Sequence, residues 1–242
     1  MRIKQLFMIM AVSVMFISCD QTTTTNTNQS LSAHDQAKES EADKAEAIAC
    51  DFEGKIDHDN YDASQASSVS FPRFPTSIYE FEKTRNLIAT EPQGAVALQV
   101  MAFELYRRNP EIGEKALKMN NTEVNFTQTL RQLKEMMDTK DANYARPYLA
   151  AALLKGATPD NAYKPSEPYT VSVRVNPTSK YQESEFLQGT VIYLQVDSKG
   201  WDTNWRGVEV VKPKGEQYYV VSNCPALYTQ CKKINGDWKE LK

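Results

Sequence analysis

The chain has 242 residues, of which 41% are hydrophobic and 24% charged, and its formal net charge is -3 at pH 7. Residues 1–18 contain two basic residues and no acidic one. When this segment is cleaved off as an export signal, the remaining chain has 26 basic and 31 acidic residues and a formal charge of -5. A mildly acidic chain has no electrostatic attraction to nucleic acid or to an anionic bilayer, so we expect neither to recruit it directly.

The N-terminus has the layout of an export signal. Arg2 and Lys4 form a cationic start, and the apolar run after them is shorter than the roughly 20 residues that a membrane-spanning helix needs. The sequence Phe-Ile-Ser-Cys at 16–19 resembles a lipobox, the site that lipoprotein signal peptidases cut. We therefore expect a signal peptide over residues 1–18, a lipid on Cys19, and attachment to the non-cytoplasmic side of a bacterial membrane. The alternative is a plain secretory peptide whose cysteine is incidental.

Residues 19–70 are predicted to be a flexible tether between the lipid and a folded domain. They are rich in Thr, Ser, Asp, Glu and Lys, and they lack the aliphatic clusters that could offset the entropy of ordering. Alanine, glutamate and lysine over 33–50 allow a short, exposed helix. Both histidines, His34 and His58, fall in this segment.

A single folded domain is expected over residues 71–242, with a helical part at 75–157. Ser77 is a suitable N-cap for a first helix. The segment 94–106, GAVALQVMAFELY, is apolar on nearly every side, which predicts a central buried helix. The pair Asn109-Pro110 should end that helix.

Two further helices are expected before residue 157. One presents a single apolar face made by Phe126, Leu130, Leu133 and Met137. The other fits between Pro147, which can occupy the first helical position, and Gly156, which can close a helix in the left-handed conformation.

From residue 168 to 242 the pattern changes to the alternation of strands with one wet face. The expected inward positions are Tyr169, Val171, Val173, Val175, Ile192, Leu194, Val196, Val208, Val210, Tyr219 and Val221. Pro213-Lys214-Gly215 predicts a hairpin, and a last strand is expected over 228–234. The order predicts an α+β fold, in which three to five helices precede an antiparallel sheet of four or five strands.

Three stretches resemble an uncharacterised family of bacterial proteins: KGATPDNAYKPSEPYTVSVRVN at 155–176, KGWDTNWRG at 199–207 and QYYVV at 217–221. Members of that family share a run like GATPENNY, then PYT, a glycine-rich turn, an Arg that leads into a strand, and an aromatic strand. The resemblance extends over roughly 92–234. Because the family is a domain of unknown function, it implies a fold boundary and no activity or catalytic residue.

We expect no metal, no cofactor and no histidine-dependent catalysis in the domain. With both histidines in the predicted tether, a Ser-His-Asp or Cys-His mechanism and an HExxH zinc site are excluded. The sequence also has no CxxC pair and no phosphate-binding glycine loop. A carboxylate-dependent, glycan-acting enzyme remains the alternative, because it needs only two acids. The candidates for such a pair are Glu183, Glu185, Asp202 and Glu209.

The most suggestive binding motif is the turn at 201–206, WDTNWR. Its indoles could stack on a ligand while its polar side chains supply hydrogen bonds, and the alternative is that the indoles pack over the sheet. The candidate binding residues are Trp201, Asp202, Asn204, Trp205 and Arg206. Asp160, Asn161 and Tyr163 occupy a polar loop, where capping and orienting the turn is the more common role.

The cysteines allow one short-loop disulfide, between Cys224 and Cys231, with Cys50 left over. Taken together, the pattern favours a lipid-anchored, non-enzymatic envelope module that binds a protein, peptide or glycan partner. The rival hypotheses are the glycan-acting enzyme and a purely structural accessory protein, which an exposed apolar patch would indicate.

Overall fold

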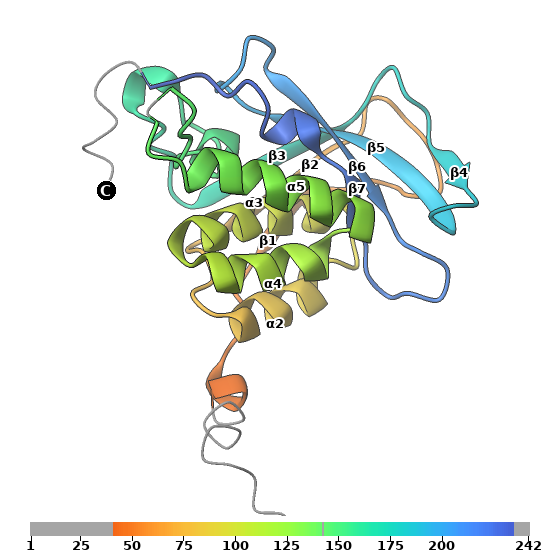
Figure 1. Ribbon diagram of the computed structural model, residues 1–242. Helices are drawn as coiled ribbons and strands as arrows, with labels where there is room; N and C mark the ends of the chain where they lie inside the picture. The colour runs from red at the N-terminus through yellow and green to blue at the C-terminus, as the bar shows by residue number, and fades with distance from the viewer. Residues whose placement is uncertain (1–40, 142, 235–242) are drawn as a thin grey trace, which may run out of the picture.

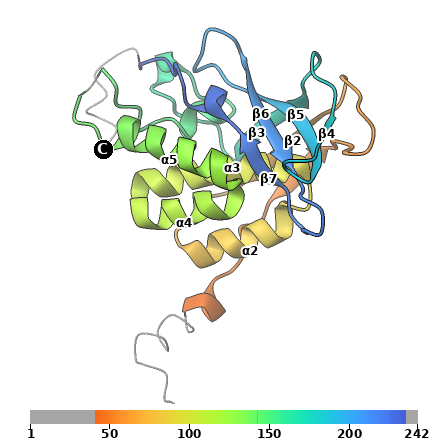
Figure 2. The same ribbon diagram turned by 45° about the vertical axis from the view of Figure 1, so that its right-hand side comes forward.

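Four helices cover one face of a single antiparallel sheet (Figures 1 and 2). The computed structural model describes residues 41–141 and 143–234. These helices are α2 (Ile78–Ile88), α3 (Pro92–Arg108), α4 (Pro110–Asn120) and α5 (Glu123–Met137), and a single helical turn at 41–44 precedes the first strand. The short 3-10 helices are η1 (Ala151–Leu153), η2 (Pro159–Asn161) and η3 (Pro225–Leu227). The α+β class is confirmed.

The sheet has seven strands, more than the four or five expected. They are β1 (Asp51–Gly54), β2 (Ala66–Phe71), β3 (Tyr169–Val175), β4 (Gln182–Ser184), β5 (Gly189–Asp197), β6 (Trp205–Val211) and β7 (Val220–Asn223). Their order is β1-β2-β3-β5-β6-β7, with β4 paired to β5. Every pairing between these strands is antiparallel.

The prediction of a tether over 19–70 was wrong for its C-terminal part. β1 and β2 form a hairpin, and β2 pairs with β3 along its whole length. Ile48, Ile56 and Val69 are buried in the core. The four helices that pack on the sheet therefore follow two strands and do not precede the whole sheet. Phe52 of β1 is exposed, but Ile48, Ile56, Val69 and Phe71 are buried, so a polar composition still yields a sheet edge. Cys19, the signal at 1–18 and His34 lie outside the described residues.

Helix α3 is the buried centre of the helical layer, as predicted. Its residues 92–106 are all buried, and it contacts the other three helices as well as β2, β3, β6 and β7. Asn109 both ends α3 and caps α4, where its side chain accepts hydrogen bonds from the backbone N–H groups of Glu111 and Ile112. No helix in the described part of the chain is long and apolar enough to cross a membrane.

The segment between Pro147 and Gly156 does not form the α-helix that we expected. The segment makes tight turns and η1, with backbone bonds such as Leu153 N–H to the Ala150 carbonyl. Leu149, Ala152 and Leu153 are fully buried, so the segment packs on several sides and not along one helical face. Gly156 does adopt the left-handed conformation, at φ +85°.

The C-terminal half matches the predicted alternation until residue 223. Strands β3, β5, β6 and β7 form where they were expected, with the hairpin between β6 and β7. The strand expected over 228–234 is absent from the described structure. In its place, Tyr228, Cys231 and Ile234 are buried in a segment with no backbone ladder.

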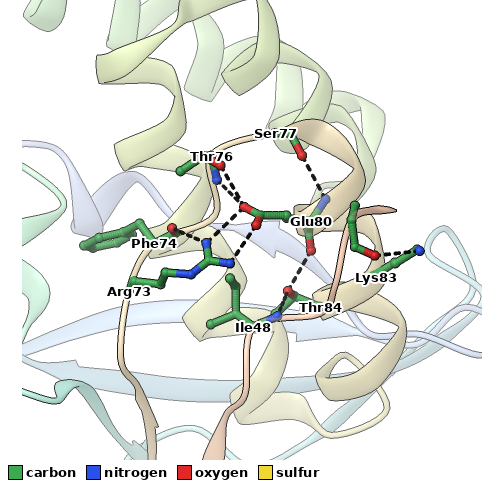
Figure 3. A network of polar contacts seen from close by, with 9 residues as sticks. Ile48, Arg73, Phe74, Thr76, Ser77, Glu80, Lys83 and Thr84 are labelled. Atoms are coloured by element: carbon green, nitrogen blue, oxygen red, sulfur yellow. Dashed lines mark hydrogen bonds and ion pairs between the residues drawn. The ribbon is translucent and has the colours of Figure 1, made fainter. Parts of the chain in front are cut away.

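A network of polar contacts joins the chain at Ile48 and at 73–76 to helix α2 (Figure 3). Ser77 caps α2, as predicted, by accepting from the Glu80 N–H at 3.2 Å. Glu80 accepts two bonds from the Arg73 guanidinium, at 2.7 and 3.1 Å, and one from the Thr76 N–H. The Ile48 N–H donates to Thr84 Oγ1 at 2.8 Å, which holds the chain before β1 against the helix.

This network makes a prediction about acid stability. The Arg73 guanidinium lowers the pKa of Glu80 to about 2. The ionised Glu80 therefore contributes fully to folding stability above the pKa of an unfolded glutamate, which is about 4.3. This contribution decreases as the pH falls from there through the pKa of Glu80 in the folded state, about 2. Urea midpoints measured between pH 7 and pH 2 should therefore fall less steeply in Glu80→Gln than in wild type, from a lower starting value. The control Glu82→Gln, an exposed position of the same helix, should follow wild type.

Candidate functional site

The sheet face that points away from the helices carries polar and aromatic side chains in registered rows. Gly207 of β6 lies opposite Gln195 of β5, which lies opposite Arg174 of β3. The next row along pairs Tyr193 with Glu209, and Glu209 with Asn223. Since successive residues of a strand point to opposite faces, these side chains share one face. We call this surface the outer face.

Gly207 creates a hollow in the outer face. A Cβ atom placed on Gly207 would meet no heavy atom within 4 Å, although its neighbours on β6 carry side chains. The hollow has a volume of about 220 Å³. Its rim is formed by Asn176, Tyr193, Glu209, Asn223, Pro225 and Ala226. We call it the Gly207 hollow.

Hydrogen bonds fix the polar side chains around the Gly207 hollow. Asn223 donates from Nδ2 to Glu209 Oε1 at 2.9 Å, and the Tyr193 hydroxyl donates to Gln182 Oε1 of β4 at 3.0 Å. Partial burial raises the pKa of Tyr193, with the Glu209 carboxylate adding to the effect, so its hydroxyl stays protonated at neutral pH. The hollow thus presents an oriented amide, a carboxylate and an aromatic ring.

An aromatic and cationic pair lies beside the hollow on the same face. Trp205 is the first residue of β6, two residues before Gly207, and it is half-buried. The Arg174 guanidinium stacks 4.0 Å from the centre of the Trp205 ring, and its Nε donates to Gln195 Oε1 at 2.9 Å. Trp205, a candidate binding residue, therefore lies on the outer face beside the hollow.

Trp201 does not belong to this surface. It is 3% exposed, and its Nε1 donates to the Thr229 carbonyl at 2.6 Å. Arg206 faces the same interior side, with its guanidinium 5.3 Å from the Trp201 ring centre and its Nε bonded to the Ala226 carbonyl. The alternative that an indole packs over the sheet therefore holds for Trp201. It lies on the side to which Arg206 points, whereas Trp205, the preceding residue of the strand, points to the outer face.

The remaining residues of the predicted binding turn are exposed. Asp202, whose side chain is 95% exposed, makes a 3.0 Å ion pair with Lys232, and such surface pairs are weak. Asn204 is exposed too, and its carbonyl accepts from the Ser198 N–H. Neither residue reaches the Gly207 hollow.

The polar loop at 158–163 has a structural role. Thr158 and Asn161 form a reciprocal capping box around η2, and Asn161 Nδ2 also donates to the Gly156 carbonyl. Tyr163 is buried, stacks on Tyr148 at 4.7 Å, and donates to the Lys232 carbonyl. Trp201 and Tyr163 together hold the segment after η3, which replaces the strand that the sequence suggested there.

The four candidate carboxylates lie in separate places. Glu183 and Glu185 line another surface hollow, beside β4, with Lys212 and Lys214. Glu209 is the one acidic residue among the described residues that line the Gly207 hollow, and Asp202 is paired with Lys232. Among the described residues, no group of three or more His, Cys, Asp or Glu side chains is placed to hold a metal ion.

His58 is part of the domain, which corrects its assignment to the tether. Its ring lies 6.0 Å from that of Tyr219 in an edge-on contact, and its Nε2 lies 3.4 Å from Asp59. Tyr219 is buried and Tyr218 is half-buried, in contact with Arg85.

The three cysteines in the described part of the chain, Cys50, Cys224 and Cys231, are free, so the expected Cys224–Cys231 bridge is not formed. Cys224 lies against polar side chains of α5, with Sγ 3.4 Å from Asn125 Nδ2 and 3.5 Å from Thr129 Oγ1. Cys231 lies instead beside Tyr163, 3.9 Å from its hydroxyl. The turn at η3 directs the two thiols into different parts of the core.

The thiols should be unreactive in the native protein. Burial raises the pKa of Cys224 to about 11 and that of Cys231 to about 12, so both stay protonated near pH 8. We expect iodoacetamide to leave both unmodified in the folded chain and to alkylate both in guanidinium without reductant. Failure to label the unfolded chain until a reductant is added would show a disulfide and contradict this assignment.

Several residues around the Gly207 hollow were missed from the sequence, namely Asn176, Tyr193, Gly207 and Asn223. Their positions depend on strand register, which brings together residues that are far apart in the chain. One signal was available: a glycine in the middle of an alternating strand often marks a close approach of another molecule.

Comparison with known proteins matches residues 73–235 to a family described as a domain of unknown function, DUF6935. No curated protein and no solved structure matches the chain. The matched range starts after β2, so the first two strands of the sheet precede it. As this range is more than half of the sequence, the chain belongs to the DUF6935 family of domains of unknown function.

Proposed function

We propose that this protein is a lipid-anchored binding module of the bacterial cell envelope, and that its ligand site is the outer face around the Gly207 hollow. The observation that carries the proposal is the hollow itself, which opens in the middle of a strand and is rimmed by hydrogen-bonded polar side chains and an aromatic ring. Binding sites combine concave shape with a few oriented polar groups in this way.

Binding, and not catalysis, fits the groups present around the hollow. A glycosidase places two carboxylates across the scissile bond, whereas Glu209 is the single acidic residue among those that line the hollow in the described structure. Its carboxylate already accepts from Asn223, which suits it to orient a ligand hydroxyl.

Two variants test the ligand site in the complete chain. Envelope extract passed over immobilised wild-type protein should leave a bound component that Gly207→Val fails to retain, because the valine side chain fills the hollow. Ser68→Val is the matched control, since Ser68 occupies an outward strand position on β2 away from the hollow. Equal retention by Gly207→Val would remove the proposed site.

The anchor has its own test. The cationic start, the short apolar run and the Ser18-Cys19 junction support lipid attachment at Cys19. Metabolic labelling with an alkyne fatty acid should mark the wild-type protein and leave Cys19→Ala unmarked, and the variant should be released from the membrane fraction. Equal labelling of the two proteins would contradict the anchor.

A further inference from the structure

We infer that the ligand of the Gly207 hollow is a neutral carbohydrate, an inference that rests on the proposed binding function. The hollow combines groups that donate, groups that accept and an aromatic ring within one small space. A sugar hydroxyl donates and accepts at once, so it can satisfy such a mixture better than a ligand of one polarity.

The hydrogen-bonding inventory supports this assignment. Asn223 uses one amide hydrogen on Glu209, and its Nδ2 carries a second, while its Oδ1 can accept. Glu209 keeps its other oxygen, Oε2, as a further acceptor. Asn176, whose backbone N–H donates to the Tyr193 carbonyl, adds a second amide to the rim, and its Oδ1 already accepts from Thr178. These planar groups suit the closely spaced hydroxyls of a sugar ring.

One aromatic ring lines the hollow, where a sugar could stack, and a second lies beside it on the outer face. Tyr193 lines the hollow itself, and its hydroxyl bond to Gln182 holds the ring in place. Trp205 lies two residues from Gly207 on the same face, with Arg174 stacked on it. The apolar faces of pyranose rings pack against such aromatic surfaces, which supply contact area at little entropic cost.

The charge of the outer face argues for a neutral ligand. The Arg174 guanidinium stacks on Trp205 and donates to Gln195, while Asp197, which lies opposite Trp205, pairs with Lys199. A polyanion such as nucleic acid or a uronic-acid polymer needs a cluster of unpaired cations, and the rim of the hollow contains no Lys or Arg among the described residues.

The position and composition of the hollow argue against a protein partner. An extended peptide that adds to a sheet pairs with an edge strand. At Gly207 one edge of β6 is paired with β5, and the other edge, beyond the end of β7, lies beside η3, where Arg206 Nε donates to the Ala226 carbonyl. Protein interfaces have an apolar core. Here the hollow is rimmed by amide and carboxylate side chains, and the outer face farther away, on β2 and β3, carries small polar side chains such as Ser68, Ser70 and Ser172.

A glycan array tests the inference directly. The chain from residue 20 onward, which lacks Cys19, is applied to immobilised neutral oligosaccharides, uronic-acid oligosaccharides and peptides, and any interaction is quantified by calorimetry. We expect binding to a neutral glycan, at least about tenfold weaker in Tyr193→Ala and in Gly207→Val. Tyr193→Phe, which keeps the ring, should retain most of the affinity, and Ser68→Val should match wild type.

The fold of each variant is checked by its thermal midpoint, and Gly207→Val should be at least as stable as wild type because its new side chain meets open space. Binding only to anionic glycans or peptides, binding to no glycan, or equal affinity in Gly207→Val would overturn the inference. If an envelope component still depends on Gly207 while no glycan binds, the carbohydrate assignment fails and the binding function stands. If nothing depends on Gly207, both fail.

Discussion

A chain trimmed to the family-matched residues, 73–235, is expected to lose cooperative unfolding, whereas a chain that begins at residue 41 should keep it. The trimmed chain lacks β1 and β2, which leaves the edge of β3 without its six registered partners. It also lacks four buried apolar side chains: Ile48, Ile56, Val69 and Phe71. Each contributes roughly 1.5–3 kcal/mol, so their sum approaches the roughly 5–15 kcal/mol by which a typical domain is stable.

Urea denaturation followed by circular dichroism measures this difference. The chain from residue 41 should show a single sigmoidal transition, and the chain from residue 73 should show a broad transition or precipitate, because an exposed edge strand and an uncovered core favour aggregation. A sharp transition with an unchanged midpoint in the shorter chain would mean that the first two strands are dispensable.

Trp201→Ala should destabilise the domain by about 3–5 kcal/mol, the usual cost of removing a buried tryptophan. The indole is enclosed in the core, and its Nε1 holds the Thr229 carbonyl in a segment that has no strand partners. Trp201→Phe should lose about 1–2 kcal/mol, because the ring is kept while the Thr229 carbonyl loses its donor.

The matched comparison is Trp205→Ala, on the same turn. Trp205 is half-buried on the outer face, where truncation should cost about 1 kcal/mol or less. Free energies of unfolding from urea titration should therefore differ by at least about 2 kcal/mol between the two alanine variants. Equal losses at the two positions would contradict the placement of the two indoles on opposite sides of the sheet.

The sequence predicted those elements whose periodic pattern is strong enough to decide the structure locally. Residues 94–106 are apolar all round and form the buried helix α3, and the alternating valines from Val171 to Val175 form β3. In β2, ASSVSF, the same alternation is present, with Val69 and Phe71 inward and Ser68 and Ser70 outward. Its three serines nevertheless favoured a linker, because the average composition of residues 19–70 is polar and the strand is only six residues long.

The site was less predictable than the fold because its parts meet only through register. Trp205 was a candidate, but nothing local to it indicates that Gly207 would lie opposite Gln195 and Arg174, or Glu209 between Tyr193 and Asn223. The burial of Trp201 was also not predictable from its neighbours in sequence. These neighbours are polar, whereas the indole donates to the Thr229 carbonyl, 28 residues away.

The pairing of β2 with β3 has a consequence for the order in which the chain folds. Ser70 and Thr170, whose hydroxyls lie 2.9 Å apart, are separated by 100 residues. Bringing such distant partners together is entropically costly and slow, whereas the helices between them need only local contacts. We therefore expect the helical layer to form early and the N-terminal hairpin to join last. Until that step, the strand edges that later pair would be open to another copy of the chain, so crowding during folding should favour misassembly there.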